Sequence, residues 1–170
     1  VALKLKDAID PARQTAAYKL NTFDVYTDTR NVVSFSLFGD YPRYLEGSVP
    51  NAIVCRQLYP GWTPRIYVAD SMPVEVLQRL EAEGSKIIQV IEPALRTSGT
   101  FWRFLLDDDA DVDFYVVGDC DSVVNLKERT AVEDWLRSRR PFPVRRDHPV
   151  HAEIMLAGMW GAHAGNLGGM

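Results

Sequence analysis

The sequence has few cysteines and no long apolar run, and these two absences narrow the class of protein. Only two of its 170 residues are cysteines, Cys55 and Cys120, and they form neither a disulfide framework nor a zinc-binding spacing. This usage favours a reducing compartment, so we expect a cytoplasmic protein. No apolar stretch is long enough to span a bilayer, and the first residues lack the apolar core of a secretory signal. We therefore expect no transmembrane segment.

The chain also lacks an excess of basic charge. It carries 19 Lys and Arg residues against 23 Asp and Glu residues, for a formal net charge of −4. Proteins that bind nucleic acid typically carry a basic stripe, and none is visible, so we expect no nucleic-acid partner. The glycine-rich end of the chain lacks a phosphate-loop lysine. The remaining composition is that of an ordinary globular domain.

The organisation along the chain predicts a single domain behind a short lead-in. Residues 1–28 have mixed polarity and weak helical periodicity, which indicates a linker or lead-in segment. Residues 29–170 are enough for one domain with a sizeable core. Because the chain begins with valine rather than methionine, we expect a processed chain or a part of a longer one.

From residue 31 onward, apolar β-rich stretches alternate with amphipathic ones. Strands are predicted over 31–38, 65–69, 86–91, 112–117 and 143–146. Helices are predicted over 41–59, 73–84, 100–106 and 127–137. This order predicts an α/β fold, with a mostly parallel sheet covered by helices on both faces. Ligands of such sheets bind beyond the carboxyl ends of the strands.

Two aspartates, Asp119 and Asp121, follow the strand predicted over 112–117. In an extended segment their side chains point the same way. Two converging carboxylates repel each other and are best tolerated with a divalent cation nearby, and Mg²⁺ and Mn²⁺ share their oxygen ligands readily with phosphates. The motif therefore predicts a site for a metal-bound diphosphate. It is equally compatible with a solvated acidic turn in which one aspartate caps the next helix.

The D-x-D motif is one of several segments that, in order, resemble bacterial GT-A-type glycosyltransferases. The matching segments are 35–40 (FSLFGD), 44–47 with Asn51, 58–62 (LYPGW), 101–104 (FWRF), 119–122 (DCDS), 131–136 (AVEDWL), 146–149 (RDHP) and 158–161 (GMWG). The resemblance implies a nucleotide-diphospho-sugar transferase fold. It also implies a metal-dependent enzyme that moves a sugar from a nucleotide-diphosphate donor to a hydroxyl group of a glycan or another acceptor.

The resemblance further implies which residues bind the donor. Asp119 and Asp121 would hold Mn²⁺ or Mg²⁺ against the diphosphate, with Cys120 between them in the same site. The end of the first strand, with Ser34, Phe35 and Ser36, would face the nucleoside. Arg103 would contact the donor or the metal-site carboxylates, and a salt bridge to the acidic run 107–109 is an equal alternative.

Two departures from the family pattern accompany this resemblance. A basic residue often precedes the D-x-D motif in the family, and Gly118 stands there in this chain. The chain also stops at Met170, so we expect the acceptor part of the domain to be incomplete.

Other candidate residues are identified by position and chemistry. Asp40 and Asp70 each follow a predicted strand and are candidate nucleotide contacts. Asp147 is a candidate base for an acceptor hydroxyl, and His148 could lie near the diphosphate. For Asp147 the alternative is an ion pair with Arg145 or Arg146.

Trp160 lies between Gly158 and Gly161 and, with Gly158, is a candidate substrate contact that could stack on a sugar ring; a place in the core is at least as compatible with its size. Two rival functions remain for the chain as a whole. One is a nucleotidyltransferase, although the expected glycine-rich loop and lysine near the first strand are missing. The other is a non-catalytic domain that binds a nucleotide or a sugar.

Overall fold

The fold is built on one five-stranded sheet. The structure is a computed structural model that describes residues 30–91, 99–146, 153 and 156–167. The strand order is β3-β2-β1-β4-β5. The strands are β1 (Asn31–Leu37), β2 (Trp62–Ala69), β3 (Lys86–Val90), β4 (Phe114–Val117) and β5 (Gly161–His163). The first four run parallel, and β5 pairs with β4 in the antiparallel direction.

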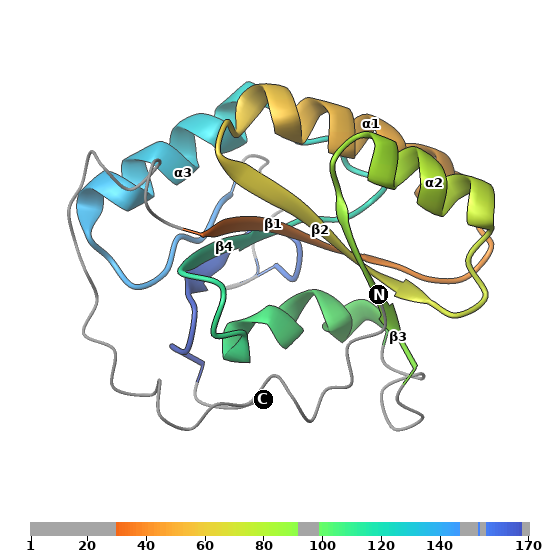
Figure 1. Cartoon of the computed structure of the whole chain (residues 1–170). Helices are drawn as coiled ribbons and strands as arrows, with labels where there is room; N and C mark the ends of the chain where they lie inside the picture. Colours follow the sequence, from red (N-terminus) through yellow and green to blue (C-terminus); the bar gives the residue numbers. More distant parts are fainter. Residues whose placement is uncertain (1–29, 92–98, 147–152, 154–155, 168–170) are drawn as a thin grey trace.

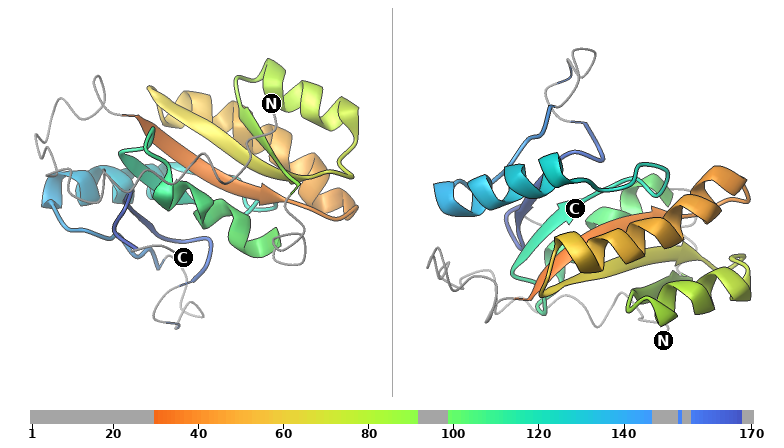
Figure 2. Two further views of the ribbon diagram at one scale, coloured as in Figure 1. Left: turned by 60° about the horizontal axis from the view of Figure 1, so that its bottom comes forward. Right: turned by 90° about the horizontal axis from the view of Figure 1, so that it is seen from above.

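Helices cover both faces of this sheet (Figures 1 and 2). The helices α1 (Pro42–Leu58), α2 (Val74–Ala82) and α3 (Leu126–Ser138) form a layer on one face. The 3₁₀ helix η4 (Gly99–Asp108) lies on the opposite face. Each face has its own cluster of buried apolar side chains. The predicted α/β fold, a mostly parallel sheet with helices on both faces, is therefore confirmed.

Local signals explain where several helices begin and end. Pro42 opens α1 at a position where its missing N–H costs nothing. The α2 helix ends before Gly84, whose φ of +80° favours a residue without a Cβ. A capping box between Asn125 and Glu128 satisfies backbone N–H groups at the start of α3.

The central strand β1 divides its side chains between the two faces. Val33, Phe35 and Leu37 join the core under the α-helices, because alternate side chains of a strand point to opposite faces. Ser34 and Ser36 point to the other face and bond the backbone of η4. These two hydroxyl contacts fix η4 against the carboxyl half of β1, where the candidate site lies.

Some elements differ from the sequence-based prediction. The strand predicted over 143–146 is a single bridge between Val144 and Trp160. β5 was not predicted, because three residues are too few to show an alternating pattern. The helix predicted over 100–106 is the longer η4, and β4 begins at Phe114 rather than at residue 112.

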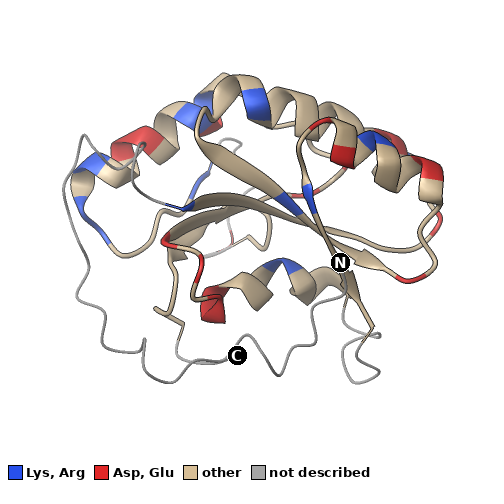
Figure 3. Ribbon diagram, viewed as in Figure 1, with Lys and Arg blue, Asp and Glu red and all other residues tan. Residues whose placement is uncertain are grey.

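Charged residues of both signs are mixed along the helices, in agreement with the sequence. Basic and acidic residues are interspersed over α2 and α3 (Figure 3). None of the helices in the described part of the chain is both long enough and apolar enough to cross a membrane.

Candidate functional site

The D-x-D segment lies at the carboxyl edge of the parallel sheet. Ser34 of β1 pairs with Val117, the last residue of β4, and Gly118 N donates to Ser34 O at 3.0 Å. Asp119, Cys120 and Asp121 follow at once. The segment therefore begins in the middle of the sheet, where strands of this architecture present their ligands.

The backbone of the D-x-D segment is a turn. Ser122 N donates to Asp119 O at 3.1 Å, which closes a four-residue turn. The expectation that the two aspartates lie in an extended segment is therefore wrong, because the chain turns directly after β4 ends at Val117. The relative position of the two carboxylates is set by this turn and not by the alternation of a strand.

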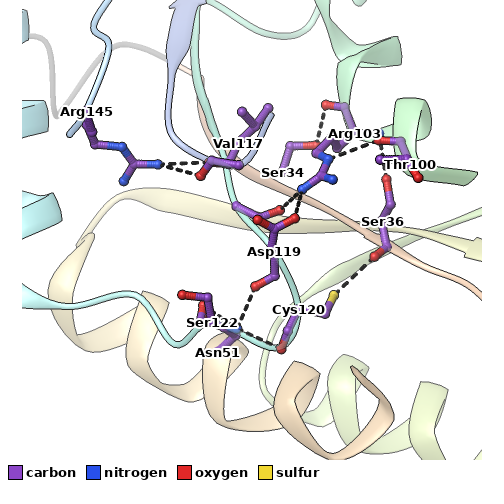
Figure 4. Close-up of polar contacts among 12 residues, drawn as sticks. Ser34, Ser36, Asn51, Thr100, Arg103, Val117, Asp119, Cys120, Ser122 and Arg145 are labelled. Atoms are coloured by element: carbon purple, nitrogen blue, oxygen red, sulfur yellow. Dashed lines mark hydrogen bonds and ion pairs between the residues drawn. The ribbon is translucent and has the colours of Figure 1, made fainter. Parts of the chain in front are cut away.

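Asn51 of α1 holds the turn from below (Figure 4). Its Nδ2 donates to the carbonyl oxygens of Cys120 and Ser122, each at 3.1 Å, and to that of Asp119 at 3.3 Å. Its Oδ1 accepts from Val124 N at 2.9 Å. With 1% of its surface exposed, Asn51 uses both ends of its amide on this one loop.

Arg103 of η4 bonds the first carboxylate of the motif. Its Nη1 donates to Asp119 Oδ1 and, at 2.7 Å, to Gly118 O, while its Nε donates to Thr100 O at 3.0 Å. Arg103 is buried, whereas the Asp119 side chain is 42% exposed. Of the two alternatives for Arg103, the structure shows the contact with the D-x-D carboxylate. Its predicted contact with a donor stays a prediction.

The second carboxylate has a different arginine partner. Arg43, in the first turn of α1, places Nε 3.2 Å from Asp121 Oδ2. The Arg43 side chain is largely exposed, and that of Asp121 is 18% exposed. An ion pair with one solvated partner is easily exchanged, so Asp121 can change partners at little cost.

A second buried arginine braces the other side of β4. Arg145 Nη2 donates to Val117 O at 2.9 Å and to Gly158 O at 3.1 Å (Figure 4 shows the contact with Val117). Its Nη1 pairs with Glu128 of α3 at 2.5 Å. Arg145 thus joins β4, α3 and the segment around Gly158, and its predicted alternative partner Asp147 lies outside the described residues.

Gly158, a predicted substrate contact, packs against Asp119. A Cβ at this position would lie 2.0 Å from Asp119 Oδ2. The absence of a side chain therefore lets the segment close on the carboxylate.

The Cys120 thiol faces the core and not the site. Its Sγ lies 3.3 Å from Ser36 O, and the side chain belongs to the core cluster under α1. Burial raises the pKa of the Cys120 thiol to about 12. A neutral buried thiol is a poor ligand for a hard cation, so we assign Cys120 a structural position in place of the predicted donor contact.

The predicted nucleoside contacts of β1 are also buried. Ser34 Oγ donates to Arg103 O at 2.8 Å, and Ser36 Oγ accepts from Arg103 N at 2.9 Å. Phe35 lies in the core, where a Cβ added at Gly118 would come within 2.7 Å of its ring. A side chain at Gly118 would therefore require the Phe35 ring to shift. The β1 side chains support the site from within.

Trp160 is a core residue. It stacks on Phe104 with ring centroids 5.3 Å apart, meets Tyr115 edge to face at 6.0 Å, and is 5% exposed. Its ring face is covered by protein, which corrects the predicted stacking on a sugar.

The remaining predicted residues fall into two groups. Asp40 and Asp70 are exposed just beyond β1 and β2, at the same edge of the sheet as the D-x-D turn. Asp147 and His148, the predicted catalytic residues, lie outside the described residues.

The donor chemistry of the two aspartates fits a hard cation. Asp119 Oδ2 and Asp121 Oδ1 lie outside the two ion pairs with Arg103 and Arg43. Both side chains are reachable by solvent. Among residues 30–91, 99–146, 153 and 156–167, no three His, Cys, Asp or Glu side chains gather to hold a metal ion. The aspartates are therefore a partial ligand set that water and phosphate oxygens could complete.

Sequence reasoning assigned no function to Asn51, Arg43 or Gly47. The first of these carries a signal: an amide directly after Pro50 within a helix is an unusual choice, since both residues are poor helix formers. Arg43 carries no comparable signal, because an arginine in a first helical turn is common on a protein surface.

Comparison with solved structures finds this architecture among glycosyltransferases. The mannosyltransferase PcManGT from Pyrobaculum calidifontis, solved in complex with GDP-Man and Mn²⁺, matches over 94% of this chain and 50% of its own, with a TM-score of 0.59 and 12% identity. The glycosyltransferase GlyE of Streptococcus pneumoniae TIGR4, solved in its apo form, matches over 81% of this chain and 34% of its own, with a TM-score of 0.47 and 18% identity.

The first of these likenesses confirms the predicted GT-A glycosyltransferase fold. The chain spans half the length of that mannosyltransferase. It matches no known family model and no curated protein. At 12% identity, the likeness is one of fold.

Proposed function

We propose that this chain is the nucleotide-sugar-binding part of a metal-dependent glycosyltransferase that transfers a sugar to an acceptor hydroxyl. The observation that carries the proposal is the pair of solvent-reachable carboxylates, Asp119 and Asp121, on one turn at the carboxyl edge of the sheet. The fold likeness to a mannosyltransferase that binds GDP-Man and Mn²⁺ supports it.

In this proposal Asp119 and Asp121 hold Mn²⁺ or Mg²⁺. When bound, the cation would neutralise the negative charge that develops on the departing diphosphate. Arg103 keeps Asp119 aimed at the site through its contacts with Gly118 and Thr100. Arg43 is exchangeable and leaves Asp121 when the cation binds. Asp40 and Asp70 are the proposed nucleotide contacts, and Asp147 and His148 the proposed catalytic residues.

Isothermal titration with UDP and with GDP, each with and without Mn²⁺, tests the proposal. We expect binding of one nucleotide that requires Mn²⁺ and that is lost in Asp121→Asn. The matched control is Asp134→Asn, which makes the same change at an exposed residue of α3 paired with Arg137. This control should bind as the unaltered chain does.

The outcomes separate the rival functions. Binding that does not need Mn²⁺ and survives in Asp121→Asn would favour a non-catalytic domain with a different ligand site. Release of the free sugar from a nucleotide sugar by the chain supports transferase chemistry. Absence of nucleotide binding under all conditions would overturn the proposal.

A further inference from the structure

The amide of Asn51 is the main polar contact between α1 and the D-x-D turn. It lies within hydrogen-bonding distance of three carbonyl oxygens and one N–H group, all between residues 119 and 124. Three acceptors surround Nδ2 and a donor faces Oδ1, so the network itself identifies which end of the amide is which. A side chain that is buried and so fully paired holds a single conformation.

Gly47, one helical turn before Asn51, also packs against the D-x-D turn. Residues four apart lie on the same face of a helix, so Gly47 and Asn51 face the turn together. A Cβ at Gly47 would lie 2.5 Å from Cys120 O and 3.3 Å from Asp121 Cα. The helix backbone thus packs directly on the turn at Gly47, while the Asn51 amide bonds it from the next turn.

These contacts bracket both carboxylates. Asn51 binds the carbonyl groups on either side of Asp121 and that of Asp119, and neither carboxylate is itself used in the contact. The backbone beneath the two side chains is therefore held from the helix, while the side chains stay available. The separation of Asp119 and Asp121 consequently depends on α1.

We propose that Asn51 is a positioning residue, which sets the placement of Asp119 and Asp121 and thereby the affinity of the site for its divalent cation. This inference rests on the proposed function. The Asn51 amide bonds only backbone groups of residues 119–124, so its effect on metal binding would be exerted through the turn. Gly47 is the close contact that lets the helix pack on this turn.

The experiment measures Mn²⁺ affinity without nucleotide, from the electron paramagnetic resonance signal of free Mn²⁺. The main variant is Asn51→Asp, which keeps the shape of the side chain but sets an oxygen against three carbonyl oxygens. Its added negative charge would by itself strengthen cation binding, so a loss of affinity reports on position. We expect affinity to fall by about 10- to 100-fold, the usual effect of removing a partner that orients metal ligands.

The matched control is Asn31→Asp. Asn31 is as buried as Asn51 and stands at the amino end of β1, at the opposite edge of the sheet. It should keep the Mn²⁺ affinity of the unaltered chain. Gly47→Ala is the second variant, because alanine favours the helix while its Cβ pushes the turn, and it too should weaken Mn²⁺ binding.

Hydrogen exchange of the metal-free chain gives a second readout. In Asn51→Asp we expect faster exchange at the amides of residues 122–124, whereas Asn31→Asp should leave these amides unchanged. If Asn51→Asp does not fold, Gly47→Ala decides the matter alone.

The outcomes distinguish this inference from the function beneath it. If the unaltered chain binds Mn²⁺ and the folded Asn51→Asp and Gly47→Ala variants bind it equally well, the inference about Asn51 is overturned and the proposed function is not. An unaltered chain that binds no Mn²⁺ overturns the proposed function and this inference with it. Weaker binding in both variants and not in Asn31→Asp supports both.

Discussion

The buried guanidinium of Arg103 bonds the exposed carboxylate of Asp119 across the carboxyl end of β4. From the other side, Arg145 bonds the carbonyl group of Val117. The carbonyl groups of Val117 and Gly118 thus accept from two different arginines, one reaching from η4 and one from beyond α3. The positive charge of Arg103 lies behind the D-x-D turn and lowers the cost of placing two carboxylates on it, whereas that of Arg145 is paired with Glu128.

Replacing Arg103 with methionine should destabilise the protein. The change removes donors to Thr100, Gly118 and Asp119, and two of these acceptors are backbone carbonyls. Each hydrogen bond from a charged group contributes about 1.5–3 kcal/mol, and the bonds of one side chain are not additive, so we expect a loss of at least about 3 kcal/mol in the free energy of unfolding, measured with urea.

The control for this measurement is Arg43→Met. Arg43 pairs with Asp121 from an exposed position, where an ion pair is worth less than about 1 kcal/mol. Equal losses in the two variants would contradict the assignment of Arg103 as the buried brace.

Replacing Gly158 with alanine should disturb Asp119 in particular. The new Cβ would overlap the carboxylate, so either the side chain of Asp119 or the segment around residue 158 must move. Overpacking of this kind costs about 1–3 kcal/mol, and we expect weaker Mn²⁺ binding together with a lower melting temperature. Ala157→Ser adds one heavy atom at the exposed neighbouring residue and should change neither. Unaltered Mn²⁺ affinity in Gly158→Ala would show that the segment does not limit the carboxylate.

Replacing Trp160 with alanine tests its place in the core. Removing a buried tryptophan costs about 3–5 kcal/mol, whereas a ligand-stacking residue at the surface would cost little. Phe101, which is 65% exposed, provides the comparison. In urea denaturation, Trp160→Ala should lose several times more stability than Phe101→Ala, and similar losses would argue against the core position.

The alternation of apolar stretches was enough to predict the fold, because each of the first four strands is long enough or apolar enough to show a pattern. Phe114–Val117, for example, is buried at all four positions. β5 was not predicted, because the feature that makes it a strand is its pairing with β4. Its three residues carry no periodic signal of their own.

The site was predictable only as far as its carboxylates. The D-x-D aspartates can be identified because the sequence shows both their charge and their position directly after a predicted strand. The turn that carries them depends on Asn51, which is 68 residues from Asp119 along the chain. The amide after Pro50 is unusual in a helix, but nothing near it in the sequence names residues 119–124 as its partners, and the same holds for the bonds of Ser34 and Ser36 to η4.

His163 should make the stability of the protein depend on pH. Its ring packs 4.3 Å from Phe114 and edge to face with Trp135 at 5.8 Å, and burial lowers the pKa of His163 below its usual value. A lowered pKa in the folded state means that the unfolded chain takes up the proton first as the pH falls. The contribution to stability is therefore complete above pH about 6.5 and is lost as the pH falls through the folded-state pKa, with a slope of at most about 1.4 kcal/mol per pH unit.

His163→Gln removes the group that takes up this proton and should flatten the pH dependence of the unfolding free energy below pH 6.5. Urea denaturation at intervals from pH 7.5 to pH 5 measures it, because the difference in unfolding free energy between the two proteins should shrink as the pH falls. The chain has three histidines, so the double variant His148→Gln, His151→Gln provides the matched control. If the slope disappears in the double variant and persists in His163→Gln, the pH dependence belongs to the 148–151 segment and the assignment to His163 is wrong.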